Sequence, residues 1–228
     1  MQHIVQFSGG KDSTAMLLMM LEKGMQIDEI IFCDTGKEFP EMYEHIKKVE
    51  QYIGRKITIL KAEKSFDYWQ KDHIKTKGKN KGSKGFGWAR PFVRWCTRVL
   101  KIQPTERYLK GKEYVQYIGI AYDEPKRHER IPPNTVHPLF DWGITEAEAL
   151  QYCYDRGFDW GGLYEKYSRV SCWCCPLQRL ENLKALYIHH PSLWEELKAM
   201  DKAQTYSFKP TYSVEQLEER FRRELQEN

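Results

Sequence analysis

A short apolar run, His3 to Phe7, leads directly into Ser8-Gly9-Gly10-Lys11-Asp12-Ser13 and then into a helical pattern. A strand that turns into a helix through two glycines is typical of the start of a parallel β-α-β unit. The alternation continues downstream, with expected elements at Ser13–Lys23 (helix), Ile27–Cys33 (strand), Pro40–Tyr52 (helix) and Lys56–Leu60 (strand). The sequence therefore predicts an α/β fold with a doubly wound, mostly parallel sheet flanked by helices.

The rest of the chain predicts further helices around a basic loop. Lysine and glycine dominate from about 71 to 94, which is typical of a flexible surface loop. A helix of about three turns is expected from Trp95, perturbed by Pro104, and then a strand at Lys112–Ile120. Capping-box patterns and Pro191 predict later helices at about 145–156, from 191 and at 213–225. We expect one domain at 1–180 and a small helical extension at 181–228 packed on it.

The Ser8–Ser13 segment has the composition of an anion-binding loop. Its glycines permit positive φ and a close approach of the backbone, and its amides precede a helix start that carries partial positive charge. Lys11 and the two serine hydroxyls add donors suited to a pyrophosphate. The spacing differs from that of the ordinary P-loop and of the dinucleotide-binding glycine fingerprint. Asp12 either assists a magnesium ion or caps the helix.

Composition places the chain among globular proteins. It has 228 residues, of which 41% are hydrophobic and 30% charged, and a formal net charge of +4. Met1 leads straight into the first expected strand with no secretion signal, so we expect a cytoplasmic protein with no membrane partner. Six cysteines are too few for a disulfide scaffold in a chain of this length.

The positive charge is concentrated in one segment. From Lys71 to Lys101 there are ten basic residues and one acidic residue, a net charge of +9, which leaves about −5 for the rest of the chain. With Phe86, Trp88 and Phe92, such a loop is suited to DNA or tRNA, because the cations contact phosphates and the aromatic rings stack on bases. The alternative is a solvated lid that closes over the phosphates of ATP. The basic residues include Arg94 and Arg98, which are candidates for anion binding.

Cysteines suggest a metal site. Cys172 and Cys175 form a Cys-x-x-Cys pattern, which puts two thiolates on one tight turn, and Cys96 is a third candidate ligand. Cys174 is a possible fourth ligand, although adjacent cysteines rarely both reach one small site. Structural zinc and uncomplexed thiols remain alternatives. Cys33 and Cys153 lie in apolar patterns and are expected in the core.

At Ser8–Ser13 the chain resembles the PP-loop ATP pyrophosphatases of the adenine nucleotide alpha hydrolase-like superfamily. Within them it is similar to the phosphoadenosine phosphosulfate (PAPS) reductase family at Cys33-Asp34-Thr35-Gly36-Lys37-Glu38-Phe39-Pro40-Glu41. Further similar segments, in the family's order, are Gly119-Ile120 with Asp123, Glu124 and Arg130, His137-Pro138-Leu139-Phe140-Asp141-Trp142, and Gly162-Leu163-Tyr164 leading to Cys172-Trp173-Cys174-Cys175-Pro176.

This resemblance implies an enzyme that binds an adenine nucleotide. It implies ATP with Mg²⁺ at the loop, attack of a substrate oxygen on the α-phosphorus, release of pyrophosphate and displacement of AMP by sulfur or nitrogen. The implied catalytic residues are Lys11 and Asp12. The implied nucleotide-binding residues are Ser8, Gly9, Gly10, Lys11, Asp12, Ser13, Asp34, Thr35 and Gly36. Arg127 and Arg130 are candidates for contact with an anionic intermediate. The resemblance also implies a [4Fe-4S] cluster on the cysteines.

Two features differ from the PAPS reductases that the chain resembles. Those enzymes attack sulfur with the cysteine of a C-terminal Glu-Cys-Gly motif, whereas this sequence has no cysteine after Cys175 and its tail, Ser213–Asn228, predicts a charged amphipathic helix. Lys11 is the form of the loop seen in relatives that use ATP. We therefore expect ATP-dependent sulfur transfer, to nucleic acid among the candidate acceptors, with a cysteine desulfurase as a candidate sulfur donor. The alternatives are a sulfonucleotide reductase that works with thioredoxin and a non-catalytic nucleotide- or nucleic-acid-binding subunit with structural zinc.

Overall fold

The computed structural model describes residues 1–227 and divides into two compact units. The first unit comprises Met1–Asp34, Pro40–Lys61 and Lys101–Leu163. The second comprises Thr35–Phe39, Ala62–Leu100 and the described residues from Tyr164 onward. The expected extension at 181–228 therefore shares its unit with a segment from the middle of the chain. Its last residue, Asn228, lies outside the described residues.

A five-stranded parallel sheet forms the centre of the first unit. Its strand order is β3-β2-β1-β4-β5, with every neighbouring pair parallel. The strands are β1 (Gln2–Gln6), β2 (Glu29–Asp34), β3 (Thr58–Lys61), β4 (Tyr114–Ile118) and β5 (Thr135–Val136). The chain winds away from β1 in both directions, so the predicted doubly wound α/β fold is confirmed. The direction reverses between β1 and β4, and ligands of such sheets bind beyond the strand ends at this point.

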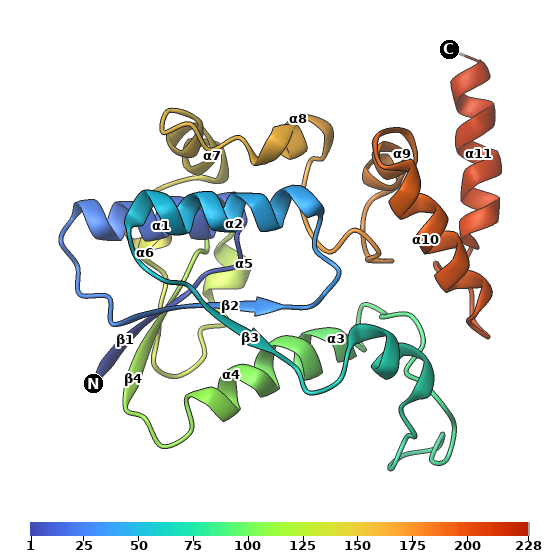
Figure 1. Cartoon of the computed structure of the whole chain (residues 1–228), viewed down its shortest axis with the longest axis horizontal. Helices are drawn as coiled ribbons and strands as arrows, with labels where there is room; N and C mark the ends of the chain where they lie inside the picture. The colour runs from blue at the N-terminus through green and yellow to red at the C-terminus, as the bar shows by residue number, and fades with distance from the viewer. Residues whose placement is uncertain (228) are drawn as a thin grey trace. The chain divides into compact units, whose positions relative to one another are not determined.

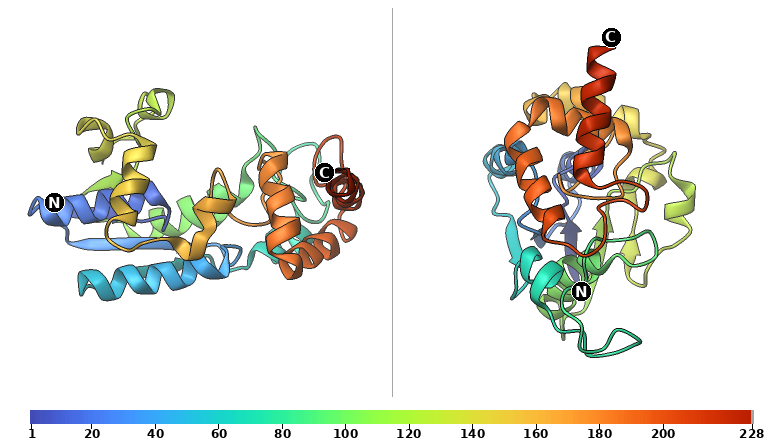
Figure 2. Two further views of the ribbon diagram at one scale, coloured as in Figure 1. Left: turned by 90° about the horizontal axis from the view of Figure 1, so that it is seen from above. Right: turned by 90° about the vertical axis from the view of Figure 1, so that its right-hand side faces the viewer.

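Helices cover both faces of this sheet. α1 (Lys11–Glu22) and α2 (Pro40–Ile53) lie on one face, and α4 (Gln103–Tyr108) lies on the other (Figures 1 and 2). α7 (Glu146–Tyr154) packs against α1 and has the predicted capping box, in which Thr145 and Glu148 bond each other's backbone amides. The shorter elements are α5 (Pro125–His128), α6 (Pro138–Asp141) and the turn η3 (Trp160–Gly162).

The buried face of α1 explains why this helix is fixed against the sheet. Ala15, Met16 and Leu17 are fully buried, as are Ile4 and Val5 of β1. Each buried aliphatic side chain of this size contributes about 1.5–3 kcal/mol. The apolar packing therefore holds the start of α1 beside the end of β1.

The second unit is mainly helical. It contains η1 (Tyr68–Asp72), α3 (Trp95–Thr97), α9 (Leu180–His189), α10 (Pro191–Lys202) and α11 (Val214–Gln226). The last three helices pack against one another, with Trp194 and Phe221 in ring contact (Figure 1). α10 begins at the predicted proline, and α11 has the predicted capping box between Ser213 and Gln216. Short elements join the units: η2 (Arg98–Ile102) follows α3, and α8 (Leu163–Lys166) follows η3.

The basic segment from Lys71 to Lys101 contributes more buried side chains than its composition predicted. Trp88, Ala89 and Trp95 are buried, and the indole Nε1 of Trp88 donates to Asp201 Oδ1 at 2.8 Å. The flexible surface loop expected at about 71–94 therefore contributes Trp88 and Ala89 to the core, because tryptophans in a lysine-rich segment still bury their rings where partners exist. Trp88 is also not available to stack on a base. No helix among residues 1–227 is long and apolar enough to cross a membrane.

Candidate nucleotide-binding site

The loop between β1 and α1 is held by a network of its own hydrogen bonds. The backbone N–H of Ser8 donates to Ser13 Oγ at 3.1 Å, and that hydroxyl donates to the carbonyl of Gly10 at 3.0 Å. The hydroxyls of Ser8 and Ser13 lie 2.9 Å apart. Gly9 has φ +79°, and a Cβ there would lie 2.6 Å from the sulfur of Met42. The loop thus closes on itself through its two serines, and only glycine fits at position 9.

Two buried aromatic residues support the loop from behind. The indole Nε1 of Trp160 donates to the carbonyl of Gly9 at 2.7 Å. The imidazole of His45 stacks on that indole at 4.4 Å between ring centroids, and its Nε2 lies 3.0 Å from the hydroxyl of Thr14. Burial lowers the pKa of His45 to about 3, so the ring is neutral at neutral pH. These contacts fix both the turn and the first part of α1.

Gly119 brings the end of β4 against the start of α1. A Cβ at this position would lie 2.8 Å from the carbonyl carbon of Asp12 and 2.8 Å from the backbone nitrogen of Ser13. Backbone atoms cannot move aside as a flexible side chain does, so no larger residue fits here. The close approach places the loop at the point where the strand order reverses, which is the expected ligand position.

A lysine and three carboxylates gather beside this loop. The ammonium of Lys11 donates to Asp12 Oδ1 and to Glu146 Oε2, each at 2.9 Å. Carboxylate oxygens of Asp12, Glu124 and Glu146 all lie within 4.8 Å of one another. Asp123 accepts a hydrogen bond from the backbone N–H of Glu146 at 3.0 Å and so fixes the start of α7. Because Arg127 pairs with Glu124, the group has two cations against three acids and keeps a net negative charge, which makes it a candidate site for a divalent metal ion.

The charges in this group shift one another's pKa values. Burial raises the pKa of Asp12, and the carboxylates of Glu146 and Glu124 raise it further, while Lys11 opposes them. Burial alone would lower the pKa of Lys11, but the two acids it contacts outweigh this and raise it. Lys11 therefore stays protonated, and Asp12 is less acidic than an ordinary aspartate.

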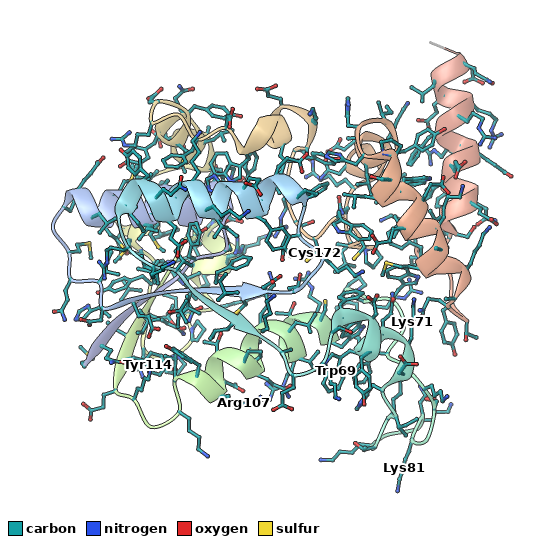
Figure 3. The ribbon with its side chains drawn as sticks, viewed as in Figure 1. Trp69, Lys71, Lys81, Arg107, Tyr114 and Cys172 are labelled. Carbon is teal, nitrogen blue, oxygen red and sulfur yellow. The ribbon has the colours of Figure 1, made fainter. Side chains whose placement is uncertain are left out.

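The cysteine segment belongs to the second unit. Cys172 and Cys175 share one turn, in which the N–H of Cys175 donates to the carbonyl of Cys172 at 3.1 Å. The sulfur of Cys172, labelled in Figure 3, lies 3.5 Å from the hydroxyl of Thr35 and 3.6 Å from Glu38 Oε1. Burial raises the pKa of the Cys175 thiol, and the charge of Cys96 raises it further, so these two thiols interact. The turn therefore presents two thiols with a third in electrostatic range.

The candidate cysteine ligands are less tightly grouped than the carboxylates beside the loop. Among residues 1–227, the only group of three or more histidine, cysteine, aspartate or glutamate ligand atoms within 4.8 Å of one another is the carboxylate group of the first unit. The sulfurs of Cys96, Cys172 and Cys175 thus do not all lie within 4.8 Å of one another. Cys174 is buried, and burial raises the pKa of its thiol well above the usual range. Burial therefore disfavours the thiolate form of Cys174 that a metal ligand needs.

Comparison with known proteins identifies the chain's family. The model of the phosphoadenosine phosphosulfate reductase domain matches residues 2–178. The chain belongs to this family. The match covers the whole sheet and the cysteine segment, so the resemblance inferred from the short motifs is confirmed.

Relatives of this PAPS reductase domain protein include both uncharacterised proteins and a named reductase. An uncharacterised protein of Methanocaldococcus jannaschii is 29% identical over 208 residues, covering 85% of this chain but 40% of that protein. A phosphoadenosine 5'-phosphosulfate reductase of Vibrio atlanticus is 22% identical over 172 residues, covering 72% of this chain and 62% of that protein. The chain thus spans less than two thirds of the length of either relative.

A solved structure has the same fold. The PAPS reductase of Candida auris, in complex with phosphate, aligns with a TM-score of 0.50 and 17% identity, covering 75% of this chain and 81% of that one. The U34-tRNA thiolase of Methanococcus maripaludis with its [4Fe-4S] cluster aligns with a TM-score of 0.46 and 15% identity, which is too weak to support an inference about this chain.

The remaining candidate residues of this PAPS reductase domain protein occupy separate places. Asp34 ends β2 in the first unit, where it accepts a hydrogen bond from Tyr43 Oη at 2.8 Å, whereas Thr35 and Gly36 belong to the second unit. The guanidinium of Arg127 donates to Glu124 Oε1 at 2.6 Å. The side chains of Arg94, Arg98 and Arg130 are exposed.

Sequence patterns did not reveal four residues that complete the site. Glu146 falls within a helical pattern and Glu124 within a family-like segment, and no local pattern marks His45 or Trp160 as functional. Glu146 lies 135 residues from Lys11, and no local pattern connects positions so far apart. Position 45 follows the apolar spacing of α2, which marks a buried face but not a polar contact.

We expect Gly119→Ala to disrupt nucleotide binding. Its methyl group would force the ends of β4 and α1 apart, so the free energy of unfolding should fall by about 1–3 kcal/mol and ATP affinity should fall with it. Gly54→Ala is the matched control, because Gly54 has φ +63° with open space around it and lies at the far end of α2. It should cost about 1 kcal/mol of stability and leave ATP affinity unchanged. Chemical denaturation measures the free energy of unfolding of each variant, and calorimetric titration measures its ATP affinity. Unchanged ATP affinity in Gly119→Ala would contradict this geometry.

Proposed function

We propose that the chain binds ATP with Mg²⁺ at Ser8–Ser13 and releases pyrophosphate as it activates a substrate for sulfur transfer. The observation that carries the proposal is the arrangement of Lys11 with Asp12, Glu124 and Glu146 beside the loop. It lies at the reversal point of a PAPS reductase-like sheet, where adenine nucleotides are expected.

The charge balance of this group explains a requirement for metal. A triphosphate carries several negative charges, and three carboxylates beside the loop would repel it. Mg²⁺ is commonly held by one or two carboxylates together with substrate phosphates, which removes this repulsion. Asp12 and Glu146 are the nearest acids to Lys11, so we assign them as the metal ligands, with Glu124 completing the group.

The loop and Lys11 would stabilise the transferring phosphoryl group. A substrate oxygen would form a bond to the α-phosphorus while the bond from that phosphorus to the bridging oxygen breaks, and pyrophosphate leaves with the electron pair. The ammonium of Lys11 and the loop amides would offset the charge that builds up on the phosphoryl oxygens. Trp160 and His45 act as positioning residues, because they hold the loop without facing the nucleotide.

The cysteine turn would hold a [4Fe-4S] cluster through Cys96, Cys172 and Cys175. Zinc at about 2.3 Å from each sulfur needs closely spaced thiolates. A cluster binds each cysteine to a different iron, so it suits three thiols that do not all lie within 4.8 Å of one another. With three protein thiolates the cluster would keep one iron available to bind sulfide. Structural zinc is the alternative, and a cysteine desulfurase is a candidate source of the sulfur.

A sulfonucleotide reductase is the second candidate, favoured by the family and by the named Vibrio atlanticus relative. It would need a cysteine of the 172–175 turn, or a partner's thiol, in place of the Glu-Cys-Gly cysteine. Cys172 is suited to this role, since Glu38 is placed to accept its thiol proton. Such an enzyme would produce sulfite from PAPS with thioredoxin.

Lys11→Ala should abolish pyrophosphate release. The change removes the cation that contacts both Asp12 and Glu146 beside the loop. Pyrophosphate formed from ATP with Mg²⁺ and a sulfide source should therefore fall at least a hundredfold. Lys47→Ala is the control, because Lys47 is exposed on α2 and pairs with Glu44, away from the loop's acids. Circular dichroism checks that both variants fold. Pyrophosphate release at the wild-type rate in Lys11→Ala would exclude the proposed chemistry.

Anaerobic purification should yield a brown protein with a broad absorption band near about 400 nm, typical of an iron–sulfur cluster. Cys172→Ser should lose the band and the iron. Cys153→Ser is the control and should keep both, since Cys153 is buried in the first unit and its thiol donates to the carbonyl of Lys11. A colourless protein that contains zinc would contradict the cluster.

A further inference from the structure

The basic arm, residues 71–98, forms a defined projection of the second unit. Its first part is a hairpin, in which the N–H of Lys75 donates to Ser83 O at 3.0 Å and the N–H of Gly82 donates to Lys75 O at 2.8 Å. An antiparallel bridge joins Ile74 to Lys84 below them. Figure 3 shows Lys81 at the tip, well away from Trp69 and Lys71 at the base. The backbone therefore presents the tip lysines to solvent.

Stacked rings make the base of the hairpin firm. Trp69 stacks on Phe86 at 5.9 Å between ring centroids, and His73 contacts both rings, with centroids 4.5 and 4.7 Å away. Phe86 stacks on Trp95 at 5.7 Å, and the indole Nε1 of Trp95 donates to Gly87 O at 3.0 Å. The rings are used within the protein, so their role is to position the hairpin and not to receive a ligand.

One aromatic side chain of the arm has no role in this packing. Phe92 lies at the tip of the turn from Arg90 to Val93, whose backbone groups bond each other at 3.0 and 3.2 Å, and it is 99% exposed. The turn is anchored, because the guanidinium of Arg90 donates to the carbonyls of Ser207 at 2.9 Å and Phe208 at 3.4 Å. The protein thus exposes a phenyl ring on a turn that is anchored within the second unit.

The arm also carries exposed basic residues. The exposed basic residues of the arm are Lys77, Lys79, Lys81, Lys84, Arg94 and Arg98. Among residues 1–227, none of these six forms an ion pair with an acidic group. Asp72 is the arm's only acid. The arm therefore combines a strongly positive surface with one exposed aromatic face.

We propose that the basic arm binds single-stranded or unpaired nucleic acid, with the cations on phosphates and Phe92 stacked on a base. Unpaired bases offer the flat faces that a phenyl ring stacks on, whereas a double helix hides them. A membrane surface would favour a larger apolar area than one ring beside Val93. Nucleic acid would then be the acceptor in the sulfur transfer proposed above. Binding to the arm does not depend on that function, but the transfer of sulfur to the bound nucleic acid does.

The test measures binding of fluorescein-labelled oligonucleotides of about 20 nucleotides by the whole chain, without ATP. The probes are single-stranded RNA, single-stranded DNA and a matched duplex, with phosphatidylserine vesicles as a further probe. Phe92→Ala should weaken single-strand binding about tenfold, and Phe92→Trp should keep it. Tyr52→Ala, which removes another exposed ring in the first unit, should have no effect.

Salt dependence tests the phosphate contacts separately. The triple variant Lys77→Ala, Lys79→Ala and Lys81→Ala should lower the slope of log Kd against log salt by about 2. A control that removes the same charge from the first unit, Lys47→Ala, Lys56→Ala and Lys110→Ala, should leave the slope unchanged. All six lysines are exposed, so both proteins should fold.

The proposal would be overturned if the chain bound no single-stranded oligonucleotide or bound only to vesicles. It would also be overturned if Phe92→Ala left oligonucleotide affinity unchanged, or if the arm and control triple variants lowered the salt dependence of binding equally. Calorimetric titration of the wild-type chain with ATP distinguishes the two proposals. If the chain binds ATP but no oligonucleotide, the nucleic-acid proposal is wrong and the proposed ATP-dependent function still stands.

Discussion

The contact between Gly119 and the backbone of Asp12 and Ser13 is the constraint on which the first unit depends. It fixes the end of β4 against the start of α1, and with it the distance between the two strands at which the sheet reverses direction. The Ser8–Ser13 turn, the buried support from Trp160 and the carboxylates on Lys11 all gather around this point. A side chain at position 119 would separate the parts that make the site.

The site holds charge that folding alone would not favour. Burial works against both ions of the Lys11–Asp12 pair, and the neighbouring acids leave the group with more negative than positive charge. Such an arrangement is typical of sites whose missing partner is a cation or a ligand carrying one. This supports the proposal of a metal-bound nucleotide over a purely structural role for the loop.

Local sequence patterns were sufficient for β1, α1, β2 and α2. The two strands are short apolar runs, Gly24 follows α1, and Pro40 begins α2. They missed β5 (Thr135–Val136), which is too short to show alternation, and α9 (Leu180–His189), which begins without a capping side chain. Glu124 and Glu146 reach Lys11 only through the fold. The arm's composition suggested exposure throughout, and the burial of Trp88 depends on Asp201 and Phe208, more than 100 residues away.

Calorimetric titration of the wild-type chain with ATP and with PAPS, each with and without Mg²⁺, tests the central claim most directly. The account predicts that ATP binds more tightly than PAPS and that its binding depends on Mg²⁺, since the carboxylates beside Lys11 repel an uncompensated triphosphate. Tighter binding of PAPS, independent of Mg²⁺, would contradict an ATP-using site and favour a sulfonucleotide reductase.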